Sequence, residues 1–480
     1  MASNDRSNLL VICCDQLAQA AVGCYGGPHG ATPNIDALAA RGVRFEHAYC
    51  PYPLCAPARA SFWTSRWPHQ TGVESNGRRW ADARVTRATP SLGSTFTDAG
   101  YLCTHFGKTH DGGALHGFEV VPFSPTPIDG PDWACYNNDT YNDVTITAQA
   151  THWLNHAPEA PWLTVVDLLN PHNICGYVGG HAGPETTIQV PDPLPELPDN
   201  FEVDNWQMLP KPVQYVCCAH RRLSQGADWP DRKYREYLKA YLHFTKLADD
   251  CVGRLLAALE RSGQADRTTV VFFADHGDAI ARHRGITKHT TFYEEMTRIP
   301  WIIAGAGVEA RGAARGEPLT NLLDLMPTLC GLARIETPRT VAGRSLAGAA
   351  RGEAVVEDRR YTVSQWHTEW GFTIEPGRMI RSKRYKYVCY LEGRDDPDDP
   401  SGGEAFYDLE ADPGETRTLI DDPAYAEALE EHRRMLADHC QATGDGFFGR
   451  QWKADPRFRE HAPGYPNHAG PAAPEVLGGV

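Results

Sequence analysis

Cys55 stands in the stretch PLCAPARASFWTS (residues 53–65), two residues before Pro57 and four before Arg59. A cysteine can act as a nucleophile when a cation or a histidine lowers the pKa of its thiol, and Arg59 could be that cation. The alternative is a buried thiol that packs as a small apolar side chain. The five-residue pattern is short enough to occur by chance, so the rest of the chain has to decide between these two interpretations.

Chemically capable side chains also follow three apolar runs. Asp15 ends NLLVICC, His172 ends WLTVVDLLNP, and Asp275 and His276 follow TTVVFFA. Two aspartates that converge on one point would repel an anionic substrate unless a cation lay between them. A hard divalent ion is the simplest such cation; oxygen ligands favour Ca²⁺, with Mg²⁺ and Mn²⁺ as rivals. The alternative is that the two aspartates cap helices that follow their strands.

The elements that must position these residues alternate between strand and helix. The three runs are continuously apolar, which is typical of strands in a sheet covered on both faces. Helices are predicted over residues 32–42 and 235–263. This alternation predicts an α/β domain with a large, mostly parallel sheet sandwiched by helices. Because ligands bind beyond the carboxyl ends of such strands, the residues that end the three runs should share one crevice.

After about residue 350 the pattern changes. Short strands and turns are predicted over residues 359–366, 378–390 and 403–415, and an amphipathic helix over residues 423–440. We therefore predict two domains. The α/β domain covers residues 1–350, and a smaller C-terminal α+β domain, built on a short antiparallel sheet and ending in an irregular tail, covers residues 351–480.

Composition excludes several classes of partner. The formal net charge of −15 argues against nucleic acid, which needs a basic stripe. No run of about 18 apolar residues is present, so no membrane span is expected. The opening MASNDRSNLLVICCDQ does not read as a signal peptide, which predicts a cytoplasmic protein, or a periplasmic or secreted one if a leader was removed. The fourteen cysteines include no CxxC pair and are expected to be free thiols.

Six stretches in a fixed order resemble the type I sulfatases of the alkaline phosphatase superfamily. They are VICCDQ, the segment from GGPHGATPNI to WPHQTGV, GYLCTHFGKTH, NPHN, ADHGD and KHTTFYEEMTRIPWI. In that family a maturation enzyme oxidises the CxPxR cysteine to Cα-formylglycine, and Cys55, Pro57 and Arg59 fill the three required positions. The resemblance implies an alkaline phosphatase-like fold and a sulfatase that hydrolyses an organic sulfate ester.

The resemblance also implies a set of metal ligands and a mechanism. One hydroxyl of the hydrated formylglycine would attack sulfur and expel the alcohol, and the second hydroxyl would allow sulfate to leave by carbon–oxygen cleavage. The implied metal ligands are Asp15, Gln16, Asp275, His276 and an oxygen of modified Cys55.

Other residues would serve the reaction as donors, acids and bases. By resemblance, Lys108 and His110 would contact the hydrate, with His110 as the base for the release of sulfate. Arg59 would hold the hydrate and the local charge. His172 and Lys288 would bind the sulfate oxygens and help to protonate the departing alcohol.

The chain departs from the family at three positions. Gln16 stands where a second aspartate is common, Ser65 stands where a glycine is common, and Thr109 replaces the tryptophan of GKWH. A CxPxR cysteine together with the pairs DQ and DH also occurs in the phosphonate monoester and phosphodiester hydrolases of the same superfamily. Hydrolysis of those esters is therefore the alternative function.

The substrate is expected to be a sulfated carbohydrate or another small sulfate ester or sulfamate, because residues 285–303 resemble carbohydrate sulfatases. The acidic chain favours a short anionic saccharide over a long polymer. Two functions from other classes stay open, a binding protein whose Cys55 is never oxidised and a hydrolase that uses the thiol itself. The oligomeric state is left open. Candidates to line the leaving-group pocket are Arg78, Arg79, Trp80, Asn173 and Tyr177.

Overall fold

One eight-stranded sheet organises the larger part of the protein. The computed structural model describes residues 6–27, 32–76, 85–123, 142–181, 190–213, 229–288, 291–316, 318–353, 359–367, 376–391 and 400–449. The strand order is β5-β4-β6-β1-β7-β8-β2-β9. The strands are β1 (Asn8–Asp15), β2 (Gly42–Phe45), β4 (Leu102–Gly107), β5 (Glu119–Val121), β6 (Trp162–Pro171), β7 (Thr268–Ala274), β8 (Trp301–Gly305) and β9 (Ala313–Arg315).

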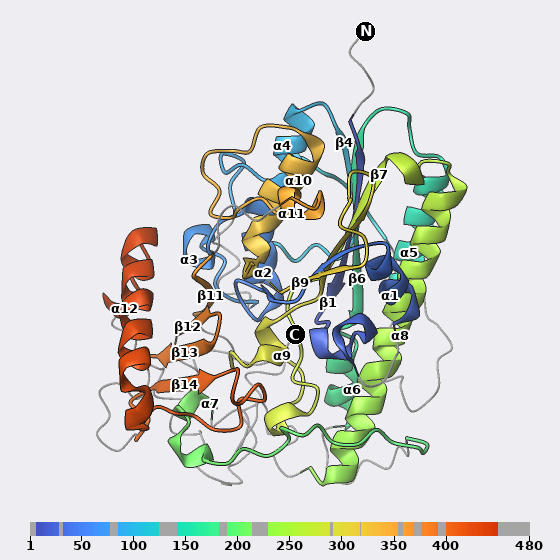
Figure 1. The fold of residues 1–480 in the computed structure, drawn as a ribbon. Coiled ribbons are helices and arrows are strands. Elements are labelled where there is room, and N and C mark those ends of the chain that lie inside the picture. Colours follow the sequence, from blue (N-terminus) through green and yellow to red (C-terminus); the bar gives the residue numbers. More distant parts are fainter. Residues whose placement is uncertain are drawn as a thin grey trace.

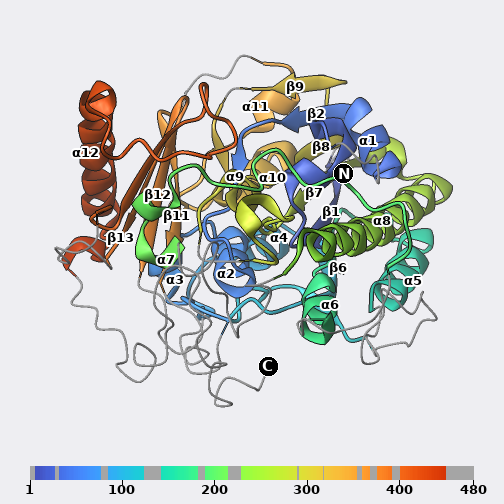
Figure 2. The ribbon, with the colours of Figure 1, turned by 90° about the horizontal axis from the view of Figure 1, so that it is seen from below.

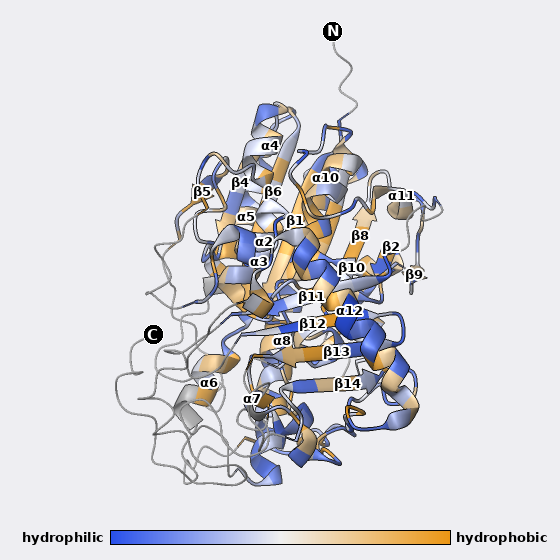
Figure 3. Ribbon diagram, turned by 90° about the vertical axis from the view of Figure 1, so that its left-hand side faces the viewer, coloured by the Kyte–Doolittle hydropathy of each residue, from blue (hydrophilic) through white to orange (hydrophobic). Residues whose placement is uncertain are grey.

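The sheet is mixed and mostly parallel, which confirms the predicted fold class. Strand β1 lies between β6 and β7 and is parallel to both, whereas β8 is antiparallel to β7 and β2. Every residue of β1 and β7 is buried, as expected for central strands covered on both faces. The apolar character of these strands is visible as orange ribbon in Figure 3.

Helices cover both faces of the sheet (Figures 1 and 2). On one face lie α1 (Pro33–Ala40), α5 (Asn142–Asn155) and the long α8 (Asp231–Arg261); on the other lie α2 (Cys55–Thr64), α4 (Leu92–Asp98) and α10 (Leu325–Ala333). The α8 helix buries Tyr237, Tyr241 and Phe244 at helical spacing, so one stripe of it faces the sheet. Shorter helices are α3 (Pro68–Thr71), α6 (Ile174–His181), α7 (Lys211–Val213), α9 (Glu294–Thr297) and α11 (Ala347–Ala350).

The C-terminal part is an antiparallel sheet with one covering helix. Its strands pair in the order β11 (Tyr361–Trp366), β12 (Gly377–Ser382), β13 (Tyr385–Tyr390) and β14 (Glu404–Asp408), and α12 (Ala426–Thr443) lies along it (Figure 1). Alternate residues face opposite sides: Ile380 packs with the apolar side chains under α12, and Met379 joins the main core. The sheet packs directly on the larger part, since Met379 belongs to the main core. The predicted domain boundary at residues 350/351 stays a prediction.

A buried ion-pair cluster also lies where this sheet meets the larger part. Lys386 on β13 is fully buried, and its Nζ lies 2.9 Å from Glu294 Oε1 on α9 and 2.7 Å from Glu415 Oε1.

A small parallel pair, β3 (Ala48–Tyr49) and β10 (Thr320–Asn321), completes the strands of the described residues. Within the described part of the chain, the cysteines are all free, and no helix has the length and apolarity needed to cross a membrane.

Candidate active site

The carboxyl ends of β1 and β7 bring two aspartates together. Cys14 and Ala274 are paired in the parallel sheet, so Asp15 and Asp275, the next residues along, emerge side by side. Both carboxylates are fully buried. The backbone N–H of Gln16 donates to Asp275 Oδ1 at 3.0 Å, which ties the end of one strand to the other. Strand register therefore creates a pair of adjacent carboxylates at the edge of the sheet.

Cys55 is the first residue of α2, and its buried thiol faces this carboxylate pair. Cys55 Sγ lies 3.5 Å from Asp15 Oδ1, 3.2 Å from His276 Nε2 and 3.2 Å from Lys288 Nζ. The N-terminus of a helix carries a partial positive charge that stabilises an anion. Pro57 is tolerated in the first turn because its missing N–H has no partner inside the helix.

The charges around Cys55 favour an anion at its side chain. Burial alone would raise the pKa of the thiol, but Lys108, Lys288 and His276 outweigh burial and hold that pKa well below its usual value. A hydrogen bond from His110 acts in the same direction. The position occupied by the Cys55 side chain is thus built to hold negative charge.

Four residues at this point offer a metal-ligand set. Asp15, Cys55, Asp275 and His276 are all buried, and their potential ligand atoms lie within 4.8 Å of one another. The carbonyl of Gly277 lies 2.8 Å from His276 Nδ1, which leaves Nε2 turned toward the cluster. Burial, followed by repulsion from Asp15, raises the pKa of Asp275. A divalent cation would relieve that repulsion, so these donors fit a hard metal ion.

Arg59 lies beneath the carboxylates with a fully buried guanidinium. Its Nε donates to Asp275 Oδ2 at 3.0 Å and its Nη1 to Asp167 Oδ2 at 2.7 Å, while Nη2 lies 3.9 Å from Asp15 Oδ2. These contacts tie Arg59 to three carboxylates, rather than to the Cys55 thiol itself. Arg59 therefore positions and neutralises the acidic side of the site.

Two lysines complete the charge around Cys55. Lys108 follows β4, and its Nζ pairs with Asp15 Oδ2. Gly107 makes this approach possible: it has φ of 97°, and a Cβ there would collide with the carbonyl oxygen of Asp167. Lys288 is buried, and its Nζ donates to Gln16 Oε1 at 2.9 Å as well as contacting Cys55. Gln16 thus places its amide oxygen beside Lys288, and its role as a metal ligand stays a prediction.

The remaining predicted site residues differ in how exposed they are and in whether the structure describes them. His110 is exposed and has φ of 41°, and hydrogen bonding from it lowers the pKa of the Cys55 thiol; burial, followed by the charge of Lys288, lowers the pKa of His172 to about 4. Asn173 is half-buried, and its carbonyl accepts the N–H of Tyr177 at 3.1 Å, at the start of α6. Tyr177 is only 2% exposed, so its side chain is packed on α6. Three candidates lie outside the described residues: Arg78, Arg79 and Trp80.

Comparison with known proteins identifies the family. A model of the sulfatase family matches residues 7–335, which is more than half of the chain. The chain belongs to the sulfatase family. A second model, of the C-terminal region of N-sulphoglucosamine sulphohydrolase, matches residues 282–442. The protein is thus a sulfuric ester hydrolase, and the resemblance drawn from its motifs is confirmed.

Two relatives match this sulfatase along its whole length. A Δ4,5-hexuronate-2-O-sulfatase of Bacteroides thetaiotaomicron is 44% identical over 476 residues, covering 99% of this chain and 97% of the relative. The solved structure of a 2-O GAG sulfatase is 45% identical, with a TM-score of 0.91 over 98% of this chain and 100% of that one. A phosphonate monoester hydrolase of Agrobacterium radiobacter shares the fold alone, at 20% identity and a TM-score of 0.72 over 92% of this chain and 97% of that one.

Membership of the family implies a metal and a formylglycine, and the buried cluster around Cys55 suits both. The structure also explains the serine at position 65. Ser65 ends α2 with φ of 52°, a left-handed conformation that favours glycine. Its hydroxyl donates to the carbonyl of Leu323 at 2.6 Å and accepts the N–H of Gly343 at 3.1 Å. These two hydrogen bonds offset the strain of a side chain at this position.

Several residues that hold this sulfatase site together were not found from the sequence. Asp167 on β6 binds Arg59, and Asp278 binds the amide of Gln16 through Oδ2 at 2.7 Å. On α8, Tyr237 donates to Asp278 Oδ1, and Tyr241 donates to the carbonyl of Gln16 at 2.7 Å. A carboxylate inside the apolar run WLTVVDLLNP was a visible signal for Asp167. No local signal marks the tyrosines, because they lie on a helix remote in sequence.

Proposed function

We propose that this sulfatase removes the 2-O-sulfate group from a hexuronate residue of a short sulfated saccharide. The substrate of the 44%-identical relative and the 2-O specificity named for the 45%-identical structure support this choice. Both similarities extend over nearly the full length of the chain, so they include the loops and the C-terminal sheet as well as the catalytic core. The smaller likeness to phosphonate monoester hydrolases carries no comparable support for the alternative.

The observation that carries the proposal is the position of the Cys55 side chain. It is part of the donor cluster, Lys288 Nζ lies 3.2 Å from it, and hydrogen bonding from His110 lowers the pKa of its thiol. Oxidation of Cys55 to formylglycine by a maturation enzyme would supply a hydrated aldehyde here, a nucleophile with a second hydroxyl for the release of sulfate. A divalent ion, Ca²⁺ in our proposal, would be held by the carboxylates and the neighbouring amide and imidazole and would polarise the sulfuryl oxygens.

The basic side chains around the nucleophile position would bind and orient the sulfate group. Lys288 is placed beside the nucleophile position and would donate to a sulfuryl oxygen. His172 follows the end of β6 and would donate to the oxygen that joins sulfur to the sugar, so that the alcohol departs protonated. His110 is exposed beside Cys55 and would take the proton whose removal releases sulfate. Arg59, fixed by its carboxylates, would keep the donor cluster in place.

The test is a panel of esters offered to enzyme produced together with its maturation enzyme. An unsaturated hexuronate disaccharide with a 2-O-sulfate should release sulfate fastest, ahead of the same disaccharide sulfated at O6 of the amino sugar, choline sulfate and an aryl phosphonate monoester. Cys55→Ala is the matched control and should release none. Faster turnover of the aryl phosphonate would favour the alternative function. Full activity of protein that retains the Cys55 thiol would refute the proposed nucleophile.

A further inference from the structure

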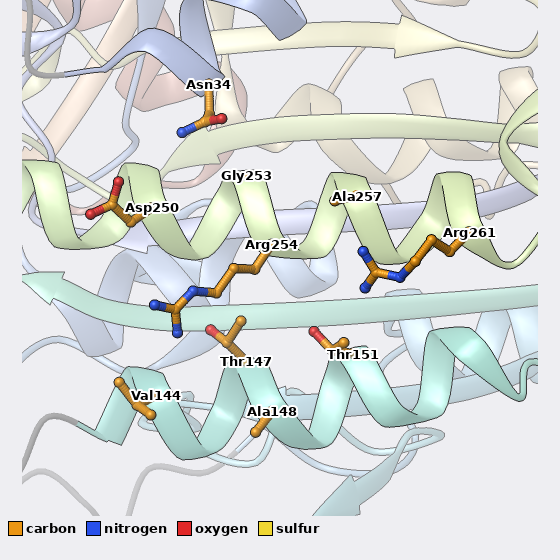
Figure 4. A pocket seen from close by; sticks show the side chains of 10 residues that line it. All are labelled: Asn34, Val144, Thr147, Ala148, Thr151, Asp250, Gly253, Arg254, Ala257 and Arg261. Atoms are coloured by element: carbon orange, nitrogen blue, oxygen red, sulfur yellow. The ribbon is translucent and has the colours of Figure 1, made fainter.

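A groove on the far side of the catalytic part from Cys55 carries two arginines without partners. It lies between α5 and α8, with a volume of about 540 Å³. Figure 4 shows Arg254 and Arg261 reaching from α8 toward α5, where Thr147 and Thr151 point back at them. The two arginines are exposed and stand two turns apart on one face of α8, about 10 Å along the helix.

Both guanidinium groups are electrostatically uncompensated within the described part of the chain. Neither Arg254 nor Arg261 takes part in any ion pair or hydrogen bond there. Both nearby carboxylates have other partners: Asp250, which itself lines the groove, pairs with Lys246 at 2.6 Å, and Glu260 pairs with Arg41 at 2.9 Å. The groove is therefore a local excess of positive charge on a chain with a net charge of −15.

The other cations of α8 show that this excess is unusual for the helix. Each of them has a partner: Arg232 with Glu236, Arg235 with Glu196, Lys246 with Asp250, Lys239 with the carbonyl of Pro193, and Lys233 over the ring of Trp229. An unpaired guanidinium is a strong donor to a planar or tetrahedral oxyanion. Two of them that face the same groove indicate a ligand with two anionic groups.

A second polar observation points into the same groove. The hydroxyl of Thr147 is buried and has no hydrogen-bond partner among the described residues. The thiol of Cys251 lies close to it but does not meet hydrogen-bond geometry, and a thiol is in any case a weak acceptor. An oxyanion held by Arg254 would offer this hydroxyl the acceptor that the protein does not supply.

We propose that the α5–α8 groove is a second saccharide site, which binds two anionic groups, sulfate or carboxylate, of one linear oligosaccharide. The choice of saccharide rests on the proposed function. Tyr241 touches Gln16, a predicted metal ligand, and Arg254 lies about 20 Å farther along α8. A disaccharide in the active site cannot reach the groove. The groove would therefore retain longer anionic chains near the enzyme and raise their local concentration.

Hydrogen exchange measured by mass spectrometry tests the site without relying on activity. A sulfated hexasaccharide that contains hexuronate should slow exchange in α5 and in the C-terminal half of α8. The double variant R254A/R261A should lose this protection, and its dissociation constant by calorimetry should rise about tenfold. Arg232→Ala with Arg235→Ala, which removes two paired arginines of the same helix, is the matched control and should change neither. Binding should also fall at 1 M NaCl, where the Debye length is about 3 Å.

Several outcomes would overturn the inference. They are no protection of these helices, equal protection in R254A/R261A, or equal protection by a neutral hexasaccharide. Equal protection by inorganic sulfate alone would assign the groove to a free anion and refute the saccharide. Failure of the proposed function is distinguishable, because it would appear as no sulfate release from the 2-O-sulfated disaccharide, a substrate whose turnover R254A/R261A should leave unchanged.

Discussion

Asp167→Asn should slow the enzyme although Asp167 touches neither Cys55 nor the donor cluster. Asp167 Oδ2 accepts Arg59 Nη1 at 2.7 Å and lies 3.3 Å from His105 Nε2, and all three side chains are fully buried. Asparagine keeps an acceptor oxygen but removes the negative charge. Among carboxylates, Arg59 would then keep only the bond to Asp275 and the longer contact of 3.9 Å to Asp15, and would be freer to turn away from the site.

The size of the effect follows from this geometry. Arg59 stays cationic, so its bond to the asparagine oxygen keeps part of the about 1.5–3 kcal/mol that a hydrogen bond to a charged partner contributes; loss of the second charge should cost about 1–2 kcal/mol. If that loss appears in the transition state, kcat falls about 5- to 30-fold, since 1.36 kcal/mol corresponds to a factor of ten. The affinity for Ca²⁺ should fall as well, because Arg59 orients Asp275.

The assay is sulfate release from the 2-O-sulfated hexuronate disaccharide, with metal affinity by calorimetry and stability by urea unfolding. Asp249→Asn is the matched control: Asp249 is also fully buried, and it accepts the backbone N–H groups of Asn34 and Ile35 away from the site. It should lose comparable stability and keep its kcat. If Asp167→Asn loses the same stability but retains wild-type kcat, KM and metal affinity, the positioning role of Asp167 is wrong.

Three further predictions concern other parts of the protein. The stability of Ser65→Gly in urea unfolding should stay within about 1 kcal/mol of the wild type, because relief of backbone strain offsets two lost hydrogen bonds. Ser65→Ala should be about 1 kcal/mol less stable than Ser65→Gly, because it loses the hydrogen bonds and keeps the strain. The reverse order of the two variants would contradict this account. Burial, with help from Glu294, raises the pKa of Glu415 to about 7, against 4.5 for the free side chain. Such a group stabilises the fold at low pH, and that stability is lost as pH rises from about 4.5 to about 7. The free energy of unfolding of Glu415→Gln should therefore rise relative to that of the wild type across this range, by at most about 3 kcal/mol. If the melting temperatures of the two proteins change in parallel between pH 5 and 8, this role of Glu415 is wrong. Chelation should abolish sulfate release, and added Ca²⁺ should restore it. Mass spectrometry of the peptide that contains residue 55 should find an aldehyde in place of the Cys55 thiol. Activity that survives chelation would argue against the metal.

The central fold could be predicted because its signals are local. The runs at residues 8–16, 162–172 and 268–278 correspond to β1, β6 and β7, and the helix predicted over 235–263 corresponds to α8. Each of these elements shows its periodicity within one window of sequence. The helix boundaries were less accurate, since α8 begins at Asp231, directly after a proline that suits a helix start.

The substrate-binding candidates show where this approach fails. Tyr177 was chosen because it follows the NPH turn, yet the structure packs it at 2% exposure on α6. Proximity in sequence to a catalytic turn does not determine whether a side chain faces the ligand, because one residue along a helix turns it by about 100°. Whether Tyr177 or Asn173 contacts a substrate stays a prediction.

The sequence by itself was enough to propose which residues carry the chemistry. Cys55, Pro57 and Arg59 share one turn and a half of a helix, and Asp15 and Asp275 each end an apolar strand, so their types and spacing are properties of short segments. Only the tertiary structure decided what holds them. Asp167, Asp278 and the α8 tyrosines, and equally the two unpaired arginines of the groove, acquire their roles from sheet register and helix packing. Those contacts join residues from 41 to more than two hundred positions apart, and no local pattern encodes such a distance.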